Sequence, residues 1–367
     1  MHLQNTKRSK PALFIAALAF LFGAISFLVT PNGSAQKLKQ LPPPPPVPRL
    51  KPKPTPKPEP IEYEVVRISS NLIVVPVSVT DVQGQPVLGL QQSDFRIQED
   101  GRQQQIAQMG DPEQVPLDIA LLIDVSASVE SRFGFEQKAA ADFLKQVMKP
   151  GDRATVFAID EAPRQIQGLS NSEVAARQVM TLVAAKGFTA FFDSLLAAEK
   201  YLDANSSQGR RRVIVVLSDG DDTARINNLY SKGDSKFTQM ENQVRFIERA
   251  QSDVLREIQR GEVTFYSINP SGRTMHLNVR VARGETGMEK FAAATGGAAF
   301  VPASESDLPQ IFQRIASEIR SQYLLQYYSD NKAGTEFRHI NVTAPTRPEL
   351  RVRAREGYYP KGAVARP

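Results

Sequence analysis

Between residues 114 and 320, short apolar runs alternate with longer stretches of helical character. The apolar runs have strand length and lie at 117–123, 154–159, 213–217, 263–268 and 297–301. The helical stretches are 135–148, 172–185, 193–204, 241–260, 286–294 and 306–321. In the first of these, Phe135, Ala139, Phe143 and Val147 recur at four-residue steps, which is typical of a helix that buries one face. Alternating strands and helices predict an α/β domain over 114–321 with a doubly wound, mostly parallel sheet.

Runs of β type flank this region on both sides. Before it, 71–80 is rich in β-branched residues, and 94–99 is followed by Asp100-Gly101, which suits a tight hairpin into 102–109. After it, 322–328, 336–343 and 350–355 have strand character. The first flank, at about fifty residues, is small for an independent core. We therefore expect the segments 61–113 and 322–359 to pair into one β-sandwich-like domain, with the α/β domain inserted between them.

The N-terminal segment has the pattern of an export signal. Three basic residues within 7–10 precede an almost unbroken apolar stretch, 12–29. As a helix this stretch would span about 27 Å, marginally short of the roughly 30 Å core of a bilayer. Small residues at 33–35 offer a cleavage site. Segment 1–35 is therefore predicted to be a signal peptide or an uncleaved membrane anchor, and either places the rest of the chain in the cell envelope or outside the cell.

A proline-rich tract with alternating Lys-Pro pairs occupies 41–60. Proline fixes the backbone dihedral φ and removes hydrogen-bond donors, so the tract should adopt polyproline II. At ~3.1 Å per residue it would reach on the order of 60 Å. We interpret 36–60 as a stiff spacer, with a ligand for a proline-binding partner as the alternative, and 360–367 as a tail.

The formal charge of +6 is unevenly placed along the chain. Residues 1–60 hold nine Lys or Arg and one acidic residue, which leaves 36 basic and 38 acidic residues for 61–367. The folded part is thus nearly neutral, and we predict no nucleic-acid partner. The absence of cysteine is compatible with an exported domain that has an adequate core. The chain has three histidines and neither a G-x-S-x-G nor a P-loop motif, so we predict that it is not an enzyme.

Oxygen-bearing side chains lie where the apolar runs end. Asp124, Ser126 and Ser128 follow 117–123, Asp219 follows 213–217, and Thr189 lies in the loop before 193–204. Ligands in open α/β sheets collect at the carboxyl ends of the strands, so we expect these loops to meet at one edge. Two carboxylates and three hydroxyls are hard oxygen donors, which select Mg²⁺, with Mn²⁺ or Ca²⁺ as rivals. The same residue types also cap helices and form turns, which is the alternative interpretation.

These five residues resemble the DxSxS…T…D ligand set of the metal-ion-dependent adhesion site in von Willebrand factor type A (VWFA) domains. The resemblance covers most of 61–359. It includes the turn Ala-Ala-Thr-Gly-Gly at 293–297, and the β-type flanks are similar to those of bacterial VWFA-related domain proteins. It implies that the serines and the threonine contact the metal directly, that both aspartates often act through water, and that a partner's carboxylate completes the ion. Phe188 departs from the family pattern, because a small residue often precedes the threonine.

Other polar residues near this set are weaker candidates for contacts with the metal or with a partner. Asp221 and Asp222 are possible accessory metal contacts, although loop solvation or helix capping is the simpler role. Two long segments after predicted strands, 220–239 and 269–287, should flank the ion, and loops on a rigid scaffold commonly carry recognition. Their candidate partner contacts are Arg225, Tyr230, Arg273 and His276.

The sequence thus predicts an exported, metal-ion-dependent protein-binding module of adhesion or scaffold type. Its partner would be a protein that presents an acidic residue, and the chain would also contact the membrane if the N-terminal apolar segment is uncleaved. One alternative is a metal-free structural protein of the envelope. The other is a metal-dependent hydrolase that uses Asp219, Asp221 and Asp222.

Overall fold

The computed structural model describes residues 72–126, 132–185, 187–227, 236–272, 279–330 and 334–360. All of them belong to the second of the chain's two units, Val66–Pro367. The predicted leader 1–35, the spacer 36–60 and the tail after Pro360 lie outside the described residues, and the domain boundaries stay predictions. Within the described residues, no helix combines the length and the apolar character needed to span a membrane.

A six-stranded sheet forms the centre of the α/β domain, with the strand order β10-β9-β8-β5-β6-β7. Its parallel strands are β5 (Leu117–Asp124), β6 (Arg153–Ile159), β8 (Arg211–Leu217), β9 (Val263–Ile268) and β10 (Ala298–Phe300). The edge strand β7 (Pro163–Ser170) runs antiparallel to β6. Every residue of β5 is buried, as expected for a central strand covered on both faces. The predicted mostly parallel sheet is confirmed.

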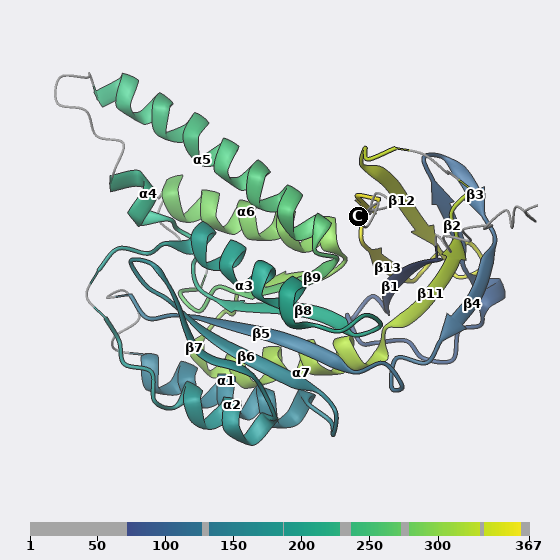
Figure 1. Ribbon diagram of the computed structural model, residues 1–367, viewed down its shortest axis with the longest axis horizontal. Coiled ribbons are helices and arrows are strands. Elements are labelled where there is room, and N and C mark those ends of the chain that lie inside the picture. The colour runs from purple at the N-terminus through teal and green to yellow at the C-terminus, as the bar shows by residue number, and fades with distance from the viewer. Residues whose placement is uncertain are drawn as a thin grey trace, which may run out of the picture. The chain divides into compact units, whose positions relative to one another are not determined.

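Helices cover both faces of this sheet (Figure 1). One apolar core holds side chains of α1 (Phe133–Val147), α2 (Ser172–Val179) and α7 (Leu308–Ser321). A second core, on the other face, holds side chains of α3 (Phe191–Asn205), α5 (Lys236–Arg260) and α6 (Val279–Thr295). The short α4 (Thr223–Asn227) follows β8, and a 3-10 turn, η3 (Glu305–Asp307), precedes α7. This two-layer covering is the doubly wound arrangement that the alternating pattern predicts.

The flanking β segments form two four-stranded sheets around a third apolar core. One sheet has the order β13-β1-β11-β4 and the other β14-β12-β2-β3. The first flank supplies β1 (Leu72–Thr80), β2 (Arg96–Glu99), β3 (Arg102–Gln104) and β4 (Ile106–Gly110), with a 3-10 turn, η1 (Gln92–Asp94), before β2. The second supplies β11 (Tyr323–Tyr328), β12 (Arg338–Thr343), β13 (Arg351–Ala354) and β14 (Gly357–Tyr358). Since β1 pairs with both β11 and β13, the predicted sandwich of N- and C-terminal segments is confirmed.

The predicted hairpin at Asp100-Gly101 joins β2 to β3. Both turn residues have positive φ, 48° for Asp100 and 77° for Gly101, and Glu99 pairs with Arg102 across the turn. Left-handed backbone at both central positions is what a two-residue hairpin requires, because its twist then matches that of the strands. The Asp-Gly dipeptide therefore sets the register of this edge of the sandwich.

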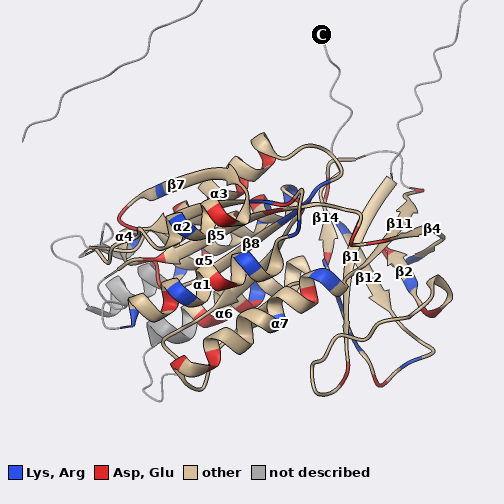
Figure 2. Cartoon of the chain, turned by 90° about the horizontal axis from the view of Figure 1, so that it is seen from below, with Lys and Arg blue, Asp and Glu red and all other residues tan. Residues whose placement is uncertain are grey.

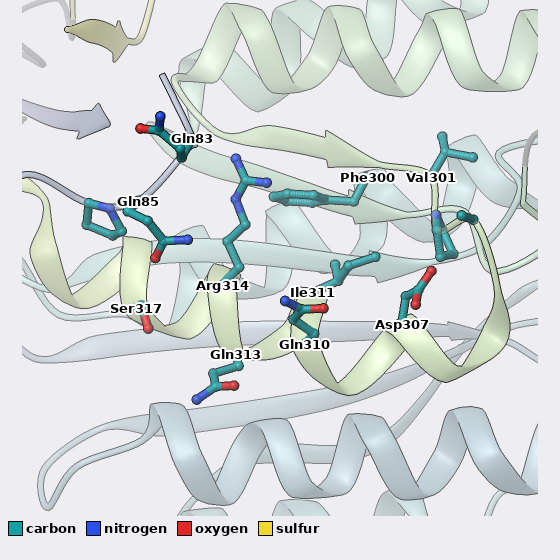
Figure 3. Close-up of a pocket in the computed structure, with 13 residues that line it drawn as sticks. Gln83, Gln85, Phe300, Val301, Asp307, Gln310, Ile311, Gln313, Arg314 and Ser317 are labelled. Atoms are coloured by element: carbon teal, nitrogen blue, oxygen red, sulfur yellow. The ribbon is translucent and has the colours of Figure 1, made fainter. Parts of the chain in front are cut away.

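Side chains in and directly after α7 make some of the contacts between the α/β domain and the sandwich, alongside contacts from α5 and α6. Gln322, directly after α7, donates from Nε2 to Ser78 Oγ at 3.1 Å, and Glu318 is ion-paired with Arg353. A cavity of about 590 Å³ lies between the loop 83–86 and α7, and Arg314 extends across it with its guanidinium carbon 5.3 Å from the centre of the Phe300 ring (Figure 3). Basic and acidic residues are interspersed along the described elements (Figure 2), consistent with their near-neutral balance.

Candidate functional site

The carboxyl ends of β5 and β8 bring Asp124 and Asp219 to the same edge of the sheet. The two strands are parallel neighbours in which Ile123 lies opposite Leu217, so Asp124 and Ser218 are the next residues in register. Ser218 Oγ donates a hydrogen bond to Asp124 Oδ2 at 2.8 Å. This bond fixes the last residue of β5 to the residue that precedes Asp219.

Backbone hydrogen bonds attach the Thr189 loop to the segment that follows Asp219. The N–H of Thr189 donates to Thr223 Oγ1 at 2.7 Å, and its carbonyl oxygen accepts from the N–H of Ala224 at 3.2 Å. The N–H of Ala190 donates to the carbonyl oxygen of Asp160, just after β6, at 2.8 Å. Thr189 is buried at 5% exposure. The loops after β5 and β8 and the Thr189 loop are therefore joined by hydrogen bonds.

The start of the DxSxS segment is folded back on Asp124. The N–H of Ser126 donates to Asp124 Oδ1 at 2.9 Å, which closes an Asx turn after β5. Ser126 is buried. The predicted ligand Ser128 lies in 127–131, outside the described residues.

Burial disfavours the ionised form of the carboxyl groups at this edge of the sheet. Asp124 is 2% exposed, and burial raises its pKa to about 6. The hydrogen bonds from Ser126 and Ser218 lower this pKa, whereas the charge of Asp219 raises it. Burial also raises the pKa of Asp219, and the N–H of Asp221 together with the charge of Arg132 lowers it. Burial is thus the main cause of both raised pKa values, and it makes the ionised forms of these two neighbouring acids costly.

Two charged residues of this region were missed in the sequence. Arg132 occupies the N-cap position of α1 without a side-chain capping hydrogen bond, and Glu136 lies in the first turn of α1 at 1% exposure. Of the predicted buried face of α1, Ala139, Phe143 and Val147 are buried, but Phe135 is 40% exposed, and Glu136 and Ala140 are buried as well. A glutamate at a helical step within an apolar stripe is the signal that could have identified this carboxylate.

The accessory aspartates have backbone partners. Asp222 accepts the N–H of Phe192 at Oδ2 and the N–H of Arg225 at Oδ1, both at 2.9 Å. These bonds cap the starts of α3 and α4, which is the simpler role expected from the sequence. The N–H of Asp221 donates to Asp219 Oδ1 at 3.1 Å, so Asp221 helps to shape the turn that presents Asp219.

The expected partner contacts are described only in part. Arg225 lies in the helix α4 and not in an extended loop as predicted. Its side chain is ion-paired with Asp193, and its guanidinium carbon is 5.6 Å from the centre of the Phe192 ring. Tyr230, Arg273 and His276 lie outside the described residues. Phe188, directly before Thr189, is 46% exposed and places an aromatic side chain at this edge.

The donor chemistry of this edge fits a hard divalent cation. Within the described ranges, no three His, Cys, Asp or Glu side chains lie together as a set that could hold a metal. The predicted set has only two carboxylates, and its other members are hydroxyls. Hydroxyl and carboxylate oxygens, with both carboxyl groups largely buried, suit Mg²⁺ or a similar divalent ion.

Comparison with known proteins gives a family match for part of the chain. Residues 119–221, from β5 through Asp219, match the family model of the von Willebrand factor type A domain. No curated protein matches the chain. The matched segment includes all five predicted ligands.

Several solved structures are similar at low identity. A von Willebrand factor type A protein from Catenulispora acidiphila is 13% identical, with a TM-score of 0.41, and the match covers 69% of this chain and 51% of that one. A variant of the PilB minor pilin from Streptococcus sanguinis is 15% identical (TM-score 0.42; 57% of this chain, 62% of that one). Proximal thread matrix protein 1 from the mussel byssus, with a zinc-occupied MIDAS motif, is 15% identical (TM-score 0.40; 59% and 48%).

The chain spans only about half the length of the first and third of these proteins. The sheet order, the two helical layers and the family match at 119–221 agree with one another. Residues 119–221 of the α/β domain are thus similar to the von Willebrand factor type A domain.

Proposed function

We propose that the chain is an exported, metal-ion-dependent protein-binding module and not an enzyme. Asp124, Ser126, Ser128, Thr189 and Asp219 would hold the ion, which we propose to be Mg²⁺, with Mn²⁺ or Ca²⁺ as alternatives. The observation that carries this proposal is the hydrogen-bonded convergence of the loops after β5 and β8 with the Thr189 loop. These loops carry two carboxylates whose pKa values are raised by burial.

The bound cation would supply a Lewis-acidic position for an acidic side chain of a partner protein. Two aspartates leave the dication little net positive charge, but hydroxyl ligands are neutral and weak donors. The ion should therefore keep an open position that a partner's carboxylate can fill. The Ser218 hydroxyl and the Ser126 N–H hold Asp124 in place, and the backbone bonds of Thr189 leave its hydroxyl available. The exposed ring of Phe188 would then contact apolar groups beside the partner's acid.

We also propose that this activity takes place outside the cytoplasm, on the basis of the N-terminal sequence. The apolar segment 12–29 would export the chain and, if uncleaved, hold it at the membrane. The proline-rich tract would carry the binding edge outward. An extracytoplasmic position gives the ion site access to partners in the envelope or on other surfaces.

Thr189→Val is expected to weaken divalent-ion binding by about tenfold, because it removes a hydroxyl ligand while it keeps the side-chain shape. Its backbone hydrogen bonds to Thr223 and Ala224 are unaffected. Isothermal titration of the full chain with Mg²⁺ and with Mn²⁺ measures the change. Thr181→Val is the matched control, since the Thr181 hydroxyl bonds only to Gln178 at the end of α2. Equal affinities of wild type and Thr189→Val would remove Thr189 from the site.

Ion binding is expected to weaken as the pH falls through about 6. The carboxyl group of Asp124, with its pKa raised to about 6, is largely ionised at pH 7.5 and largely protonated at pH 5. A proton on this carboxyl competes with the cation, so affinity should fall by about tenfold between these pH values. Titrations with Mn²⁺ at both pH values check this, and a flat profile would contradict it.

The rival functions give different results in the same assays. A wild-type chain that binds neither Mg²⁺ nor Mn²⁺ supports the metal-free structural role. Turnover of phosphoesters above blank in the presence of Mg²⁺ supports the hydrolase. Capture of envelope proteins that is lost with chelator, and restored by Mg²⁺, supports the binding module.

A further inference from the structure

Arg132 connects the loop after β5 to the loop after β9. Its Nη1 donates to the carbonyl oxygen of Pro270 at 3.0 Å, and its Nη2 donates to Ser271 Oγ at 3.2 Å. In the sheet, β8 lies between β5 and β9, and Asp219 follows β8. The guanidinium therefore lies near the carboxyl end of β8. Arg132 is thus a positively charged side chain near the proposed ion site.

Glu136 lies one helical turn after Arg132 and is 1% exposed. Neither of its side-chain oxygens has a hydrogen-bond partner among the described residues. Arg132 is ion-paired with Glu136, with its Nε 4.0 Å from Glu136 Oε1. Burial raises the pKa of Glu136 to about 7, the charge of Arg132 lowers it, and the charges of Asp124 and Glu305 raise it further. Glu136 lies in the first turn of α1, the helix that follows the loop beginning after Asp124, so a dication held by Asp124 would act on it through space.

A carboxylate without hydrogen bonds in a buried position destabilises the fold, and an isosteric amide would cost less there. Packing against the residues that the structure describes therefore does not account for a glutamate at this position. A charge does account for it, because a negative group in a low-dielectric interior acts over several ångströms on a cation that it does not touch.

We propose that Glu136 and Arg132 set the affinity of the ion site with opposite signs and without contacting the ion. Glu136 attracts the dication and strengthens its binding, whereas Arg132 repels it and weakens its binding. This inference rests on the proposed function. It adds two positioning residues that adjust how tightly the same site holds its ion.

The test compares four variants of the full chain by calorimetric titration with Mn²⁺ at pH 7.5. Glu136→Gln is expected to weaken binding by about tenfold, within the range for groups outside the ligand set. Arg132→Gln is expected to tighten binding by several-fold, because a repelling charge is removed. The same four proteins are also melted in chelator.

The matched controls are Glu199 and Arg212, which lie at the amino ends of the parallel strands, away from the proposed ion site. Glu199 is buried with its pKa also raised by burial to about 7, but its neighbours are Arg212 and the start of β9. Arg212, at the start of β8, donates to Asp203 Oδ1 at 2.7 Å and to the carbonyl oxygen of Gly261 at 3.0 Å. Glu199→Gln and Arg212→Gln repeat the same charge changes far from the ion and should leave Mn²⁺ affinity unchanged.

The outcomes separate the two proposals. In chelator at pH 7.5, Glu136→Gln is expected to melt at or above the wild-type temperature, because a buried charge without hydrogen bonds is removed. Weaker Mn²⁺ binding by both variants, or no change in either, overturns this inference while wild-type uptake of Mn²⁺ preserves the proposed function. A wild type that takes up no Mn²⁺ overturns both.

Discussion

The Asp124→Ala protein is expected to show no measurable heat of Mn²⁺ or Mg²⁺ binding under conditions in which the wild type saturates. The substitution removes one of two carboxylates and also frees the Ser126 N–H and the Ser218 hydroxyl that hold the turn after β5. Loss of a group outside the ligand set already costs about 10–100-fold in metal affinity. Loss of Asp124 should therefore cost about 100-fold or more.

This loss should not arise from unfolding. Asp124 is 2% exposed, and its pKa is raised to about 6, so its ionised form gains little from the fold at neutral pH. In chelator, the melting temperature of Asp124→Ala is expected to lie within a few degrees of the wild type. Asp142→Ala is the control, since Asp142 is an exposed partner of Lys138 on α1. Wild-type ion uptake by Asp124→Ala would end the proposed function.

Gly297→Ala is expected to destabilise the α/β domain by about 3 kcal/mol or more. Gly297 precedes β10, and a Cβ at this position would overlap the carbonyl oxygen of Phe265 in the neighbouring strand β9. Backbone of a parallel sheet cannot move aside without loss of ladder hydrogen bonds. Chemical denaturation followed by circular dichroism measures the change.

A second glycine separates this overlap from backbone strain. Gly209 has a φ of 82°, and no atom lies within 4 Å of the place that a Cβ would take there. Gly209→Ala should therefore cost only about 1 kcal/mol, from its left-handed backbone. The φ of Gly297 is not in the left-handed region, so its whole cost comes from overlap with Phe265. Equal stability losses for the two variants would contradict this explanation.

The main architecture could be predicted because its strands are short apolar runs of the right length. The five parallel strands match the predicted runs to within about two residues at each end, because continuous burial leaves a continuous apolar signature. The edge strand β7 was missed. Its sequence from Pro163 is largely polar, and none of its residues is fully buried, so hydropathy gave no signal for it.

Helix ends were less predictable than strand positions. The helix expected over 172–185 ends at Val179, because the N–H and hydroxyl of Thr181 both bond to the carbonyl oxygen of Gln178 and form a turn. Conversely, α6 begins at Val279, earlier than the expected 286, although its first turns carry polar residues. Local hydrogen bonds and tertiary packing decide such ends, and neither is visible in periodicity.

The candidate site was partly predictable from the ends of strands. Asp124 and Asp219 follow buried parallel neighbours, so topology alone places them together. The hydrogen bonds that attach the Thr189 loop depend on Thr223, which nothing in the local pattern distinguishes. The Arg132–Glu136 pair was missed because hydropathy assigns a glutamate to the exposed face of a helix, whereas tertiary packing buries it here.

The sandwich has a consequence for the order in which the chain can fold. The strand β1 takes its neighbours from β11 and β13, which are made after about 240 further residues. When the chain is synthesised from the N-terminus, β1 therefore cannot pair with its native neighbours until nearly all of the chain has been made. The α/β domain is complete before that moment, so it can act as the folded template that brings the last strands back to the first.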